Sequence, residues 1–124
     1  MLALISCLSI TVGFWADYEK KRLRRFHLSG REELPVAEVV DLFNYGNDYE
    51  ASWIIEILHE LSASTSTDIG MLRPSDRLGM EMKPIEGFEG FDRFDWLPKS
   101  VYEKMNENLR LEELVRLLWD EHST

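Results

Sequence analysis

Residues 49–62, YEASWIIEILHELS, decide the fold of this 124-residue chain, because they carry its clearest helical pattern. Apolar residues recur there at spacings of three and four, while polar residues occupy the opposite face. The centre of the apolar face is formed by Ile54, Ile57, Leu58 and Leu61. An apolar stripe this broad is typical of a helix that lies in a hydrophobic core. We therefore expect this segment to be the core helix.

Weaker helical patterns flank the core helix on both sides. Residues 35–43, 98–109 and 109–122 each place apolar side chains on one helical face. Residues 78–83 instead alternate apolar and polar side chains, which predicts one short strand. The expected fold class is mainly α: a small bundle of three to four helices with one long irregular aromatic loop, preceded by an N-terminal apolar helix. The expected core residues are Trp53, Ile54, Ile57, Leu58, Leu61, Leu114 and Leu118.

Polar and turn-forming residues mark the expected boundaries between these elements. Asp48 precedes the core helix and is a good N-cap residue. Residues 27–33 contain a glycine and predict a linker, and residues 63–68, ASTSTD, predict a polar loop. Residues 73–77, RPSDR, predict a turn, because proline fixes φ and the serine and aspartate side chains accept hydrogen bonds from nearby amides.

Residues 85–96, IEGFEGFDRFDW, combine aromatic rings with acidic side chains and two glycines. The glycines disfavour regular structure, so we expect an irregular loop. The sequence leaves two roles open for its rings: they plug the core, or they form an exposed docking strip for a protein partner, since aromatic side chains are enriched at interface hot spots. The candidate partner-binding residues of the second alternative are Phe88, Phe91, Asp92, Phe94 and Trp96.

The first 15 residues, MLALISCLSITVGFW, contain no charged residue. At about 1.5 Å per residue a helix of this length reaches roughly 22 Å, so it needs the residues that follow to cross a hydrocarbon core of about 30 Å. We divide the chain into residues 1–18, an apolar helix and possible membrane anchor; residues 19–33, a basic juxtamembrane segment and linker; and residues 34–124, an acidic helical domain.

Positive charge follows the apolar run directly, and Lys and Arg near the end of a span prefer the cytoplasmic side of a membrane. The expected location is membrane-associated, with the acidic domain in the cytoplasm. Two alternatives stay open: an N-terminal helix that packs on the domain's own core in a soluble cytoplasmic protein, or a secretory signal peptide. The expected membrane-interface residues are Trp15, Tyr18, Lys20, Lys21, Arg22, Arg24 and Arg25.

Charge is distributed unevenly along the chain. Residues 1–31 hold six Lys or Arg against two acids, a balance of +4, whereas residues 32–124 hold eight against 21, a balance of −13. An acidic body disfavours nucleic-acid binding, so we expect no nucleic acid among the partners. Cys7 is the single cysteine of the sequence, which excludes an intrachain disulfide.

We expect no catalytic residue, no cofactor and no bound metal. The sequence lacks a Gly-rich phosphate loop, a nucleophile elbow and the acid spacing of a calcium loop. His59 and Glu60 begin like a zinc-protease helix, but Ala63 occupies the position of the second histidine. Glu56 and His59 have a spacing that suits a surface metal, although a solvated helix face explains them more simply.

Residues 68–124 resemble the later part of an acyl or peptidyl carrier protein. Residues 73–78, RPSDRL, are similar to the proline and acid turn before that family's modification site. Residues 97–104 and 109–115 are similar to its short third helix and its final helix. The family's Asp-Ser-Leu attachment site has no counterpart, because residues 76–99 contain no serine. The resemblance implies a helical-bundle scaffold that has lost the prosthetic group.

The function expected from the sequence is non-enzymatic: a membrane-attached adaptor or scaffold that binds a protein partner through an acidic and aromatic surface. The alternative is a soluble carrier-like or regulatory helical bundle, in which the N-terminal helix belongs to the core. A small metal-dependent hydrolase that uses Glu56, His59 and nearby acids is a third possibility.

Overall fold

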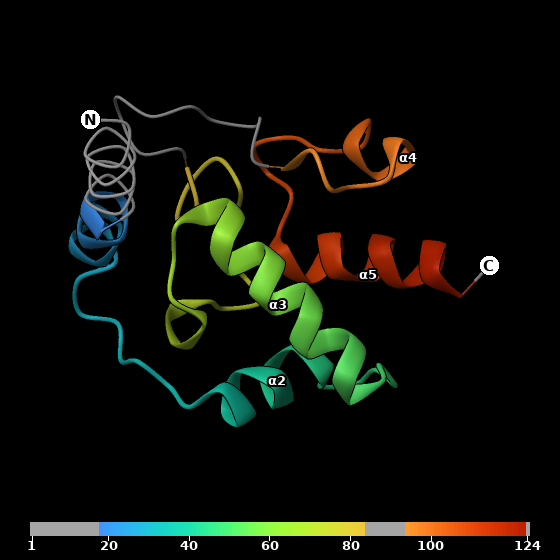
Figure 1. Cartoon of the computed structure of the whole chain (residues 1–124), viewed down its shortest axis with the longest axis horizontal. Coiled ribbons are helices and arrows are strands. Elements are labelled where there is room, and N and C mark those ends of the chain that lie inside the picture. Colours follow the sequence, from blue (N-terminus) through green and yellow to red (C-terminus); the bar gives the residue numbers. More distant parts are fainter. Residues whose placement is uncertain (1–17, 84–93, 124) are drawn as a thin grey trace, which may run out of the picture.

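The computed structural model describes residues 18–83 and 94–123, and these residues are mainly helical (Figure 1). The fold class is confirmed at this level, and no strand occurs in the two described ranges. The expected N-terminal apolar helix falls on residues 1–17, which lie outside them. The helical elements are residues 18–27, which we name the basic helix, α2 (Val36–Asn44), α3 (Ala51–Thr65), the 3₁₀ helix η1 (Ile69–Met71), α4 (Lys99–Tyr102) and α5 (Leu111–His122).

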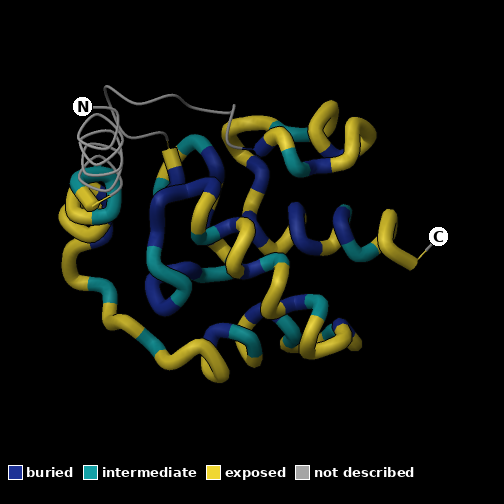
Figure 2. Tube along the Cα trace, in the orientation of Figure 1, coloured by how far each residue is buried: buried dark blue, intermediate teal, exposed yellow. Residues whose placement is uncertain are grey.

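The helix α3 lies at the centre, with the basic helix at one edge of the molecule and α4 and α5 at the other (Figure 1). Its apolar face is buried, as the sequence predicts, while its outer face is exposed to solvent (Figure 2). Trp53 and Ile57 are partly buried and pack against the core. The predicted core residues that are buried are Ile54, Leu58, Leu61, Leu114 and Leu118.

The start of α3 differs from the predicted one, because Glu50 rather than Asp48 is the N-cap residue. The Glu50 side chain makes no capping hydrogen bond. The chain is instead guided into α3 by Asn44, whose Oδ1 accepts from the Tyr49 amide at 2.9 Å and whose Nδ2 donates to the Tyr49 carbonyl at 3.2 Å. A side chain from the end of α2 therefore fixes the backbone that leads into α3.

The predicted polar loop at residues 63–68 is wrong in its boundary and its exposure. The helix α3 continues to Thr65, and residues 64–67 are buried. Buried hydroxyl groups need partners, and here the backbone supplies them. Thr65 Oγ1 donates to the Leu61 carbonyl at 2.7 Å, and Thr67 Oγ1 donates to the Thr65 carbonyl at 3.0 Å. Polar residues thus form a buried turn, with Ser66 at a left-handed φ of 51°.

The predicted strand at residues 78–83 is also wrong. Residues 78–82 form turns, with Leu78 and Met82 buried and Met80 exposed. Two amides of this segment pair with a distant loop, since Leu78 N donates to the Leu109 carbonyl at 3.0 Å. Gly79 N similarly donates to the Glu107 carbonyl at 2.8 Å. These bonds secure the segment without a neighbouring strand.

The predicted helix over residues 98–109 ends early, because α4 stops at Tyr102. Asn106 Oδ1 accepts from the Asn108 amide at 2.9 Å, a local bond that competes with helix continuation. The last helix, α5, forms as predicted but begins at Leu111. Carbonyls of the predicted turn at residues 73–77 accept from the first amides of α5, with 2.8 Å between Leu111 N and the Asp76 oxygen.

We expect Leu58→Ala to lower the free energy of unfolding by about 2–5 kcal/mol, because it leaves a cavity in a fully buried site. Ile55→Ala is the matched control, since Ile55 lies on the exposed face of the same helix and should change stability far less. Urea unfolding of both variants measures the difference. Equal losses would mean that α3 is not oriented as described.

Candidate functional site

The basic helix is attached to the body of the protein by a buried arginine. Arg24 is only 2% exposed and donates three hydrogen bonds to backbone carbonyls from three of its nitrogens. Nε donates to Thr65 at 3.1 Å, Nη1 to Glu81 at 2.7 Å and Nη2 to Lys83 at 2.6 Å. The planar guanidinium suits this task because its donors diverge in a fixed fork. We name this set of contacts the Arg24 clamp.

Burial lowers the pKa of Arg24 to about 10, which still leaves the guanidinium charged at neutral pH. A buried charge is costly unless hydrogen bonds satisfy it, and the three carbonyl oxygens provide them. The clamp therefore depends on all three acceptors being in place at once. It joins the basic helix to the last residue of α3 and to residues 81–83.

Further contacts extend the attachment along the chain. Leu28 is buried at the end of the basic helix, and the exposed Arg25 pairs with Asp68. Arg31 donates at 2.8 Å to Oδ2 of Asp76, a carboxylate that is itself buried and also accepts from a backbone amide. The segment 27–33, predicted as a linker, is thus held against the body.

The outer face of the basic helix is solvent-exposed. Tyr18, Arg22 and Phe26 follow one another at four-residue spacing, and Phe26 is 81% exposed. Arg22 pairs with Glu19 within the helix, with an Nη2–Oε2 distance of 2.9 Å. Arg24 lies on the other side of the helix, where its guanidinium donates to backbone carbonyls of the body. Of the expected membrane-interface residues, only Tyr18, Arg22 and Arg25 are strongly exposed among those the structure describes.

Neither of the two described ranges, 18–83 and 94–123, contains a helix long and apolar enough to cross a membrane. The possible anchor at residues 1–18 falls almost entirely outside those ranges, as does the interface residue Trp15. Membrane attachment through this segment stays a prediction.

The candidate partner-binding segment is described only at its end. Phe94 is buried in the core, and Trp96 Nε1 donates to Ser64 Oγ at 2.7 Å. These two rings contribute to the core, which is the first of the two roles that the sequence leaves open. Phe88, Phe91 and Asp92 lie outside the described residues, so the docking strip stays a prediction.

Acidic side chains dominate the part of the body that contains α2 and α3. Residues 32–72, which we name the acidic stretch, contain nine Asp or Glu and no Lys or Arg. The basic helix carries five Lys or Arg against one acid, so the folded protein separates its charges between elements. The exposed acids of the acidic stretch are Glu32, Glu33, Glu38, Asp41, Asp48, Glu50, Glu56 and Glu60.

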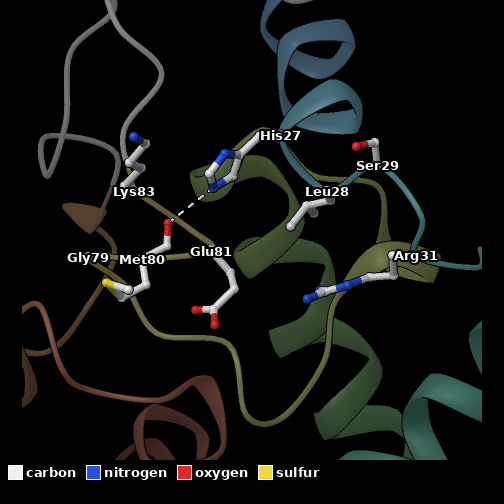
Figure 3. A pocket seen from close by; sticks show the side chains of 8 residues that line it. All are labelled: His27, Leu28, Ser29, Arg31, Gly79, Met80, Glu81 and Lys83. Atoms are coloured by element: carbon white, nitrogen blue, oxygen red, sulfur yellow. Dashed lines mark hydrogen bonds between the residues drawn. The ribbon is translucent and has the colours of Figure 1, made fainter.

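A groove of about 510 Å³ separates the end of the basic helix from residues 79–83 (Figure 3). His27 Nε2 lies 3.3 Å from the Met80 carbonyl oxygen across it. Two of its charged side chains already bind other parts of the fold: Arg31 binds Asp76, and Glu81 accepts from the Arg77 amide at 2.9 Å. Burial opposes ionisation of Glu81, but backbone hydrogen bonds hold its pKa below the usual value. Besides these two side chains, His27 and Lys83 line the groove.

An aromatic cluster joins the start of α3 to the end of α5. The rings of Trp53 and Trp119 cross edge to face, with centroids 4.8 Å apart. Tyr49 contacts both of them, and His122 stacks at 5.4 Å from Trp119. Such ring pairs each add about 0.5–1.5 kcal/mol beyond the area that they bury. The cluster fixes the packing of α5 on α3.

The sequence predicts a metal site only as a minor alternative, on the outer face of α3. No group of three or more His, Cys, Asp or Glu side chains among residues 18–83 and 94–123 is placed to hold a metal ion. Glu56 and His59 are exposed on the outer face of α3.

The Arg24 clamp is the feature that reasoning from the sequence misses. Treating residues 20–25 as one basic cluster hides the spacing within it. Arg24 and Leu28 are four residues apart and share the buried side, whereas Arg22 and Phe26, also four apart, share the exposed side. A helical wheel of this segment carries that signal.

Comparison with protein-family models, with curated proteins and with solved structures found no match to this chain. The resemblance of residues 68–124 to carrier proteins therefore stays a prediction, and the function must be argued from the molecule itself.

We expect Arg24→Met to lower the free energy of unfolding by at least about 2 kcal/mol, because buried carbonyls lose their donors. Arg24→Lys should recover little of this lost stability, since one ammonium group cannot donate in the three directions of the guanidinium fork. Arg22→Met is the matched control and should leave the urea midpoint unchanged, because its ion pair is exposed. A similar midpoint for all three variants would contradict the clamp.

We expect Tyr49 to contribute to the loss of stability at alkaline pH. Burial raises the pKa of its phenol, against an opposing effect of Arg116, so the folded state favours the neutral form. The stability that the neutral Tyr49 phenol contributes is complete below its pKa in the unfolded chain, about 10. This contribution is lost as the pH rises through the pKa of Tyr49 in the folded protein.

Urea unfolding between neutral and strongly alkaline pH tests this dependence. Tyr49→Phe should show a shallower alkaline loss than the natural chain. Tyr45→Phe, at an exposed tyrosine, should follow the natural chain at every pH. Parallel curves for Tyr49→Phe and the natural chain would refute the assignment.

Proposed function

We propose that this protein is a non-enzymatic adaptor, attached to a membrane through residues 1–18, whose acidic domain binds a protein partner on the cytoplasmic side. The proposal rests on the order of an uncharged run, a basic helix and an acidic body along the chain. It assigns no chemistry to the acidic domain.

The Arg24 clamp is the observation that carries the proposal. An anchor on a loose linker would leave the orientation of the domain undefined. Here the basic helix directly follows the apolar run and is fixed to the body by Arg24, Leu28 and the Arg25–Asp68 pair. A membrane-bound N-terminus would consequently set the position of the whole domain.

Charge separation supports a partner on the acidic side. The acidic stretch contains nine acids and no Lys or Arg of its own, and of these acids Asp68 pairs with Arg25 of the basic helix. Several apolar side chains are exposed among the acids. Complementary charge speeds association and selects partners, so a basic protein surface is the natural match. The exposed apolar side chains of this stretch are Val36, Leu42, Tyr45 and Ile55.

A soluble regulatory bundle is the second candidate function. The burial of Arg24 and Leu28 favours it, because part of the N-terminal region already belongs to the fold. The two candidates differ in whether the apolar run meets lipid, and this can be measured directly.

Fractionation of cells that express the full, untagged chain tests the proposal. We expect the protein in the membrane pellet, resistant to high salt and released by detergent. Ile5→Asp together with Leu8→Asp should move it to the supernatant, because each Asp costs about 2.5–3.5 kcal/mol inside a membrane-spanning helix.

Leu42→Asp is the matched control, since it adds the same charge at an exposed position of α2 and should leave the protein in the pellet. Recovery of the natural chain in the supernatant without detergent would refute membrane attachment and favour the soluble bundle.

A further inference from the structure

We propose that the outer face of the basic helix lies flat on an anionic lipid surface, as a second membrane contact in addition to the apolar run. This inference rests on the proposed membrane attachment and specifies which folded surface meets the lipid and which lipid charge it prefers. The side chains proposed to contact the lipid are those of Tyr18, Arg22, Leu23 and Phe26.

The exposure of this face is unusual for its composition. Phe26 is 81% exposed, Tyr18 60% and Leu23 36%, on a helix whose other side is fixed by the Arg24 clamp. The clamp prevents the helix from rotating these rings into the core. Aromatic and leucine side chains of this kind are favoured at the boundary between headgroups and acyl chains.

Charge complementarity selects lipid of negative charge as the occupant. Apart from the buried Arg24, the basic helix has four Lys or Arg against Glu19 and Asp68, a balance of +2. Arg22 pairs with Glu19 on the exposed surface, where ion pairs are weak and headgroup phosphates compete with the carboxylate. Juxtamembrane cations are attracted to anionic lipid by the surface potential.

The rest of the molecule disfavours the opposite orientation. The acidic stretch carries nine acids and no Lys or Arg, so an anionic surface repels it. Attraction at the basic helix and repulsion at α2 and α3 together favour one orientation of the protein on the membrane. An uncharged lipid surface would provide neither effect.

A fluorophore that reports polarity tests the inference in the full chain. With Cys7 replaced by Ser, Leu23→Cys places the label on the proposed face, and Leu42→Cys places it on the acidic stretch. The two leucines are matched, since both lie on helices and are 36% and 42% exposed. Each labelled protein is bound to vesicles of phosphatidylcholine alone and of phosphatidylcholine mixed with phosphatidylserine.

We expect a blue shift and protection from iodide quenching at position 23 with the mixed vesicles, reversed by high salt, and no change at position 42. Arg22→Gln in the position-23 background should lower the ratio of lipid-contacting to water-exposed label about fivefold, the equivalent of one cation near the surface. Phe26→Ser should lower the same ratio.

Each other outcome has a defined meaning. Sedimentation with both kinds of vesicle while label 23 stays in water would overturn the lipid-facing helix but keep the anchor. Equal shifts with both lipid compositions, or equal shifts at positions 23 and 42, would overturn the preference for anionic lipid and the single orientation. A shift at position 23 without vesicles would assign the face to a protein contact instead. Failure to sediment with either vesicle would overturn the anchor and this inference together.

Discussion

One guanidinium group connects parts of this protein that are far apart in sequence. Arg24 binds carbonyl oxygens 41, 57 and 59 residues away: that of Thr65 at the end of α3, and those of Glu81 and Lys83 in an irregular segment. Without such a donor the Glu81 and Lys83 carbonyls would lose a charged partner, whereas the Thr65 carbonyl would keep the hydroxyl of Thr67. The irregular middle of the chain and the basic helix therefore stabilise each other.

The pattern repeats with two other arginines. Arg31 donates to the Met71 carbonyl and to Asp76, and Arg73 donates to the Gly70 and Leu72 carbonyls. Asp76 in turn provides a carbonyl to the start of α5. The irregular part of the described chain, residues 66–83 with the short η1, is thus held by arginine side chains where another fold would use strand pairing.

Hydrophobic periodicity predicts the parts of the fold that depend on burial alone. The predicted apolar faces of α3 and α5 are correct because buried residues such as Leu58 and Leu114 have apolar neighbours at helical spacing. The prediction for residues 78–83 is wrong because their conformation depends on hydrogen bonds to the distant Leu109 and Glu107 carbonyls, which no local pattern contains. The prediction for residues 63–68 is wrong because hydroxyl groups bond to nearby carbonyls and the distant Arg24 donates to Thr65. The chain does not return to a helix after α4 ends at Tyr102, and a local bond between Asn106 and Asn108 lies within the irregular residues that follow.

The candidate site also has one feature that the sequence predicts and one that it does not. Charge counting locates the basic and acidic halves, because charge is additive along the sequence. It cannot tell that Arg24 faces inward while Arg22 faces outward, since that depends on which side of the helix the body covers. Arg22 and Arg24 contribute equally to the charge count, yet Arg24 binds the body of the protein and Arg22 faces solvent.

The long separations within the Arg24 clamp also order events during synthesis. At about 5–20 residues per second, the ribosome adds Lys83 roughly 3–12 s after Arg24, so the arginine has no complete set of acceptors during that interval. The apolar run and the basic helix leave the ribosome in that same period, before the body can hold them. A membrane-targeting factor would therefore meet the N-terminal segment before Arg24 has bound its carbonyl acceptors. Arg24 would form these bonds only after residues 65–83 have been synthesised.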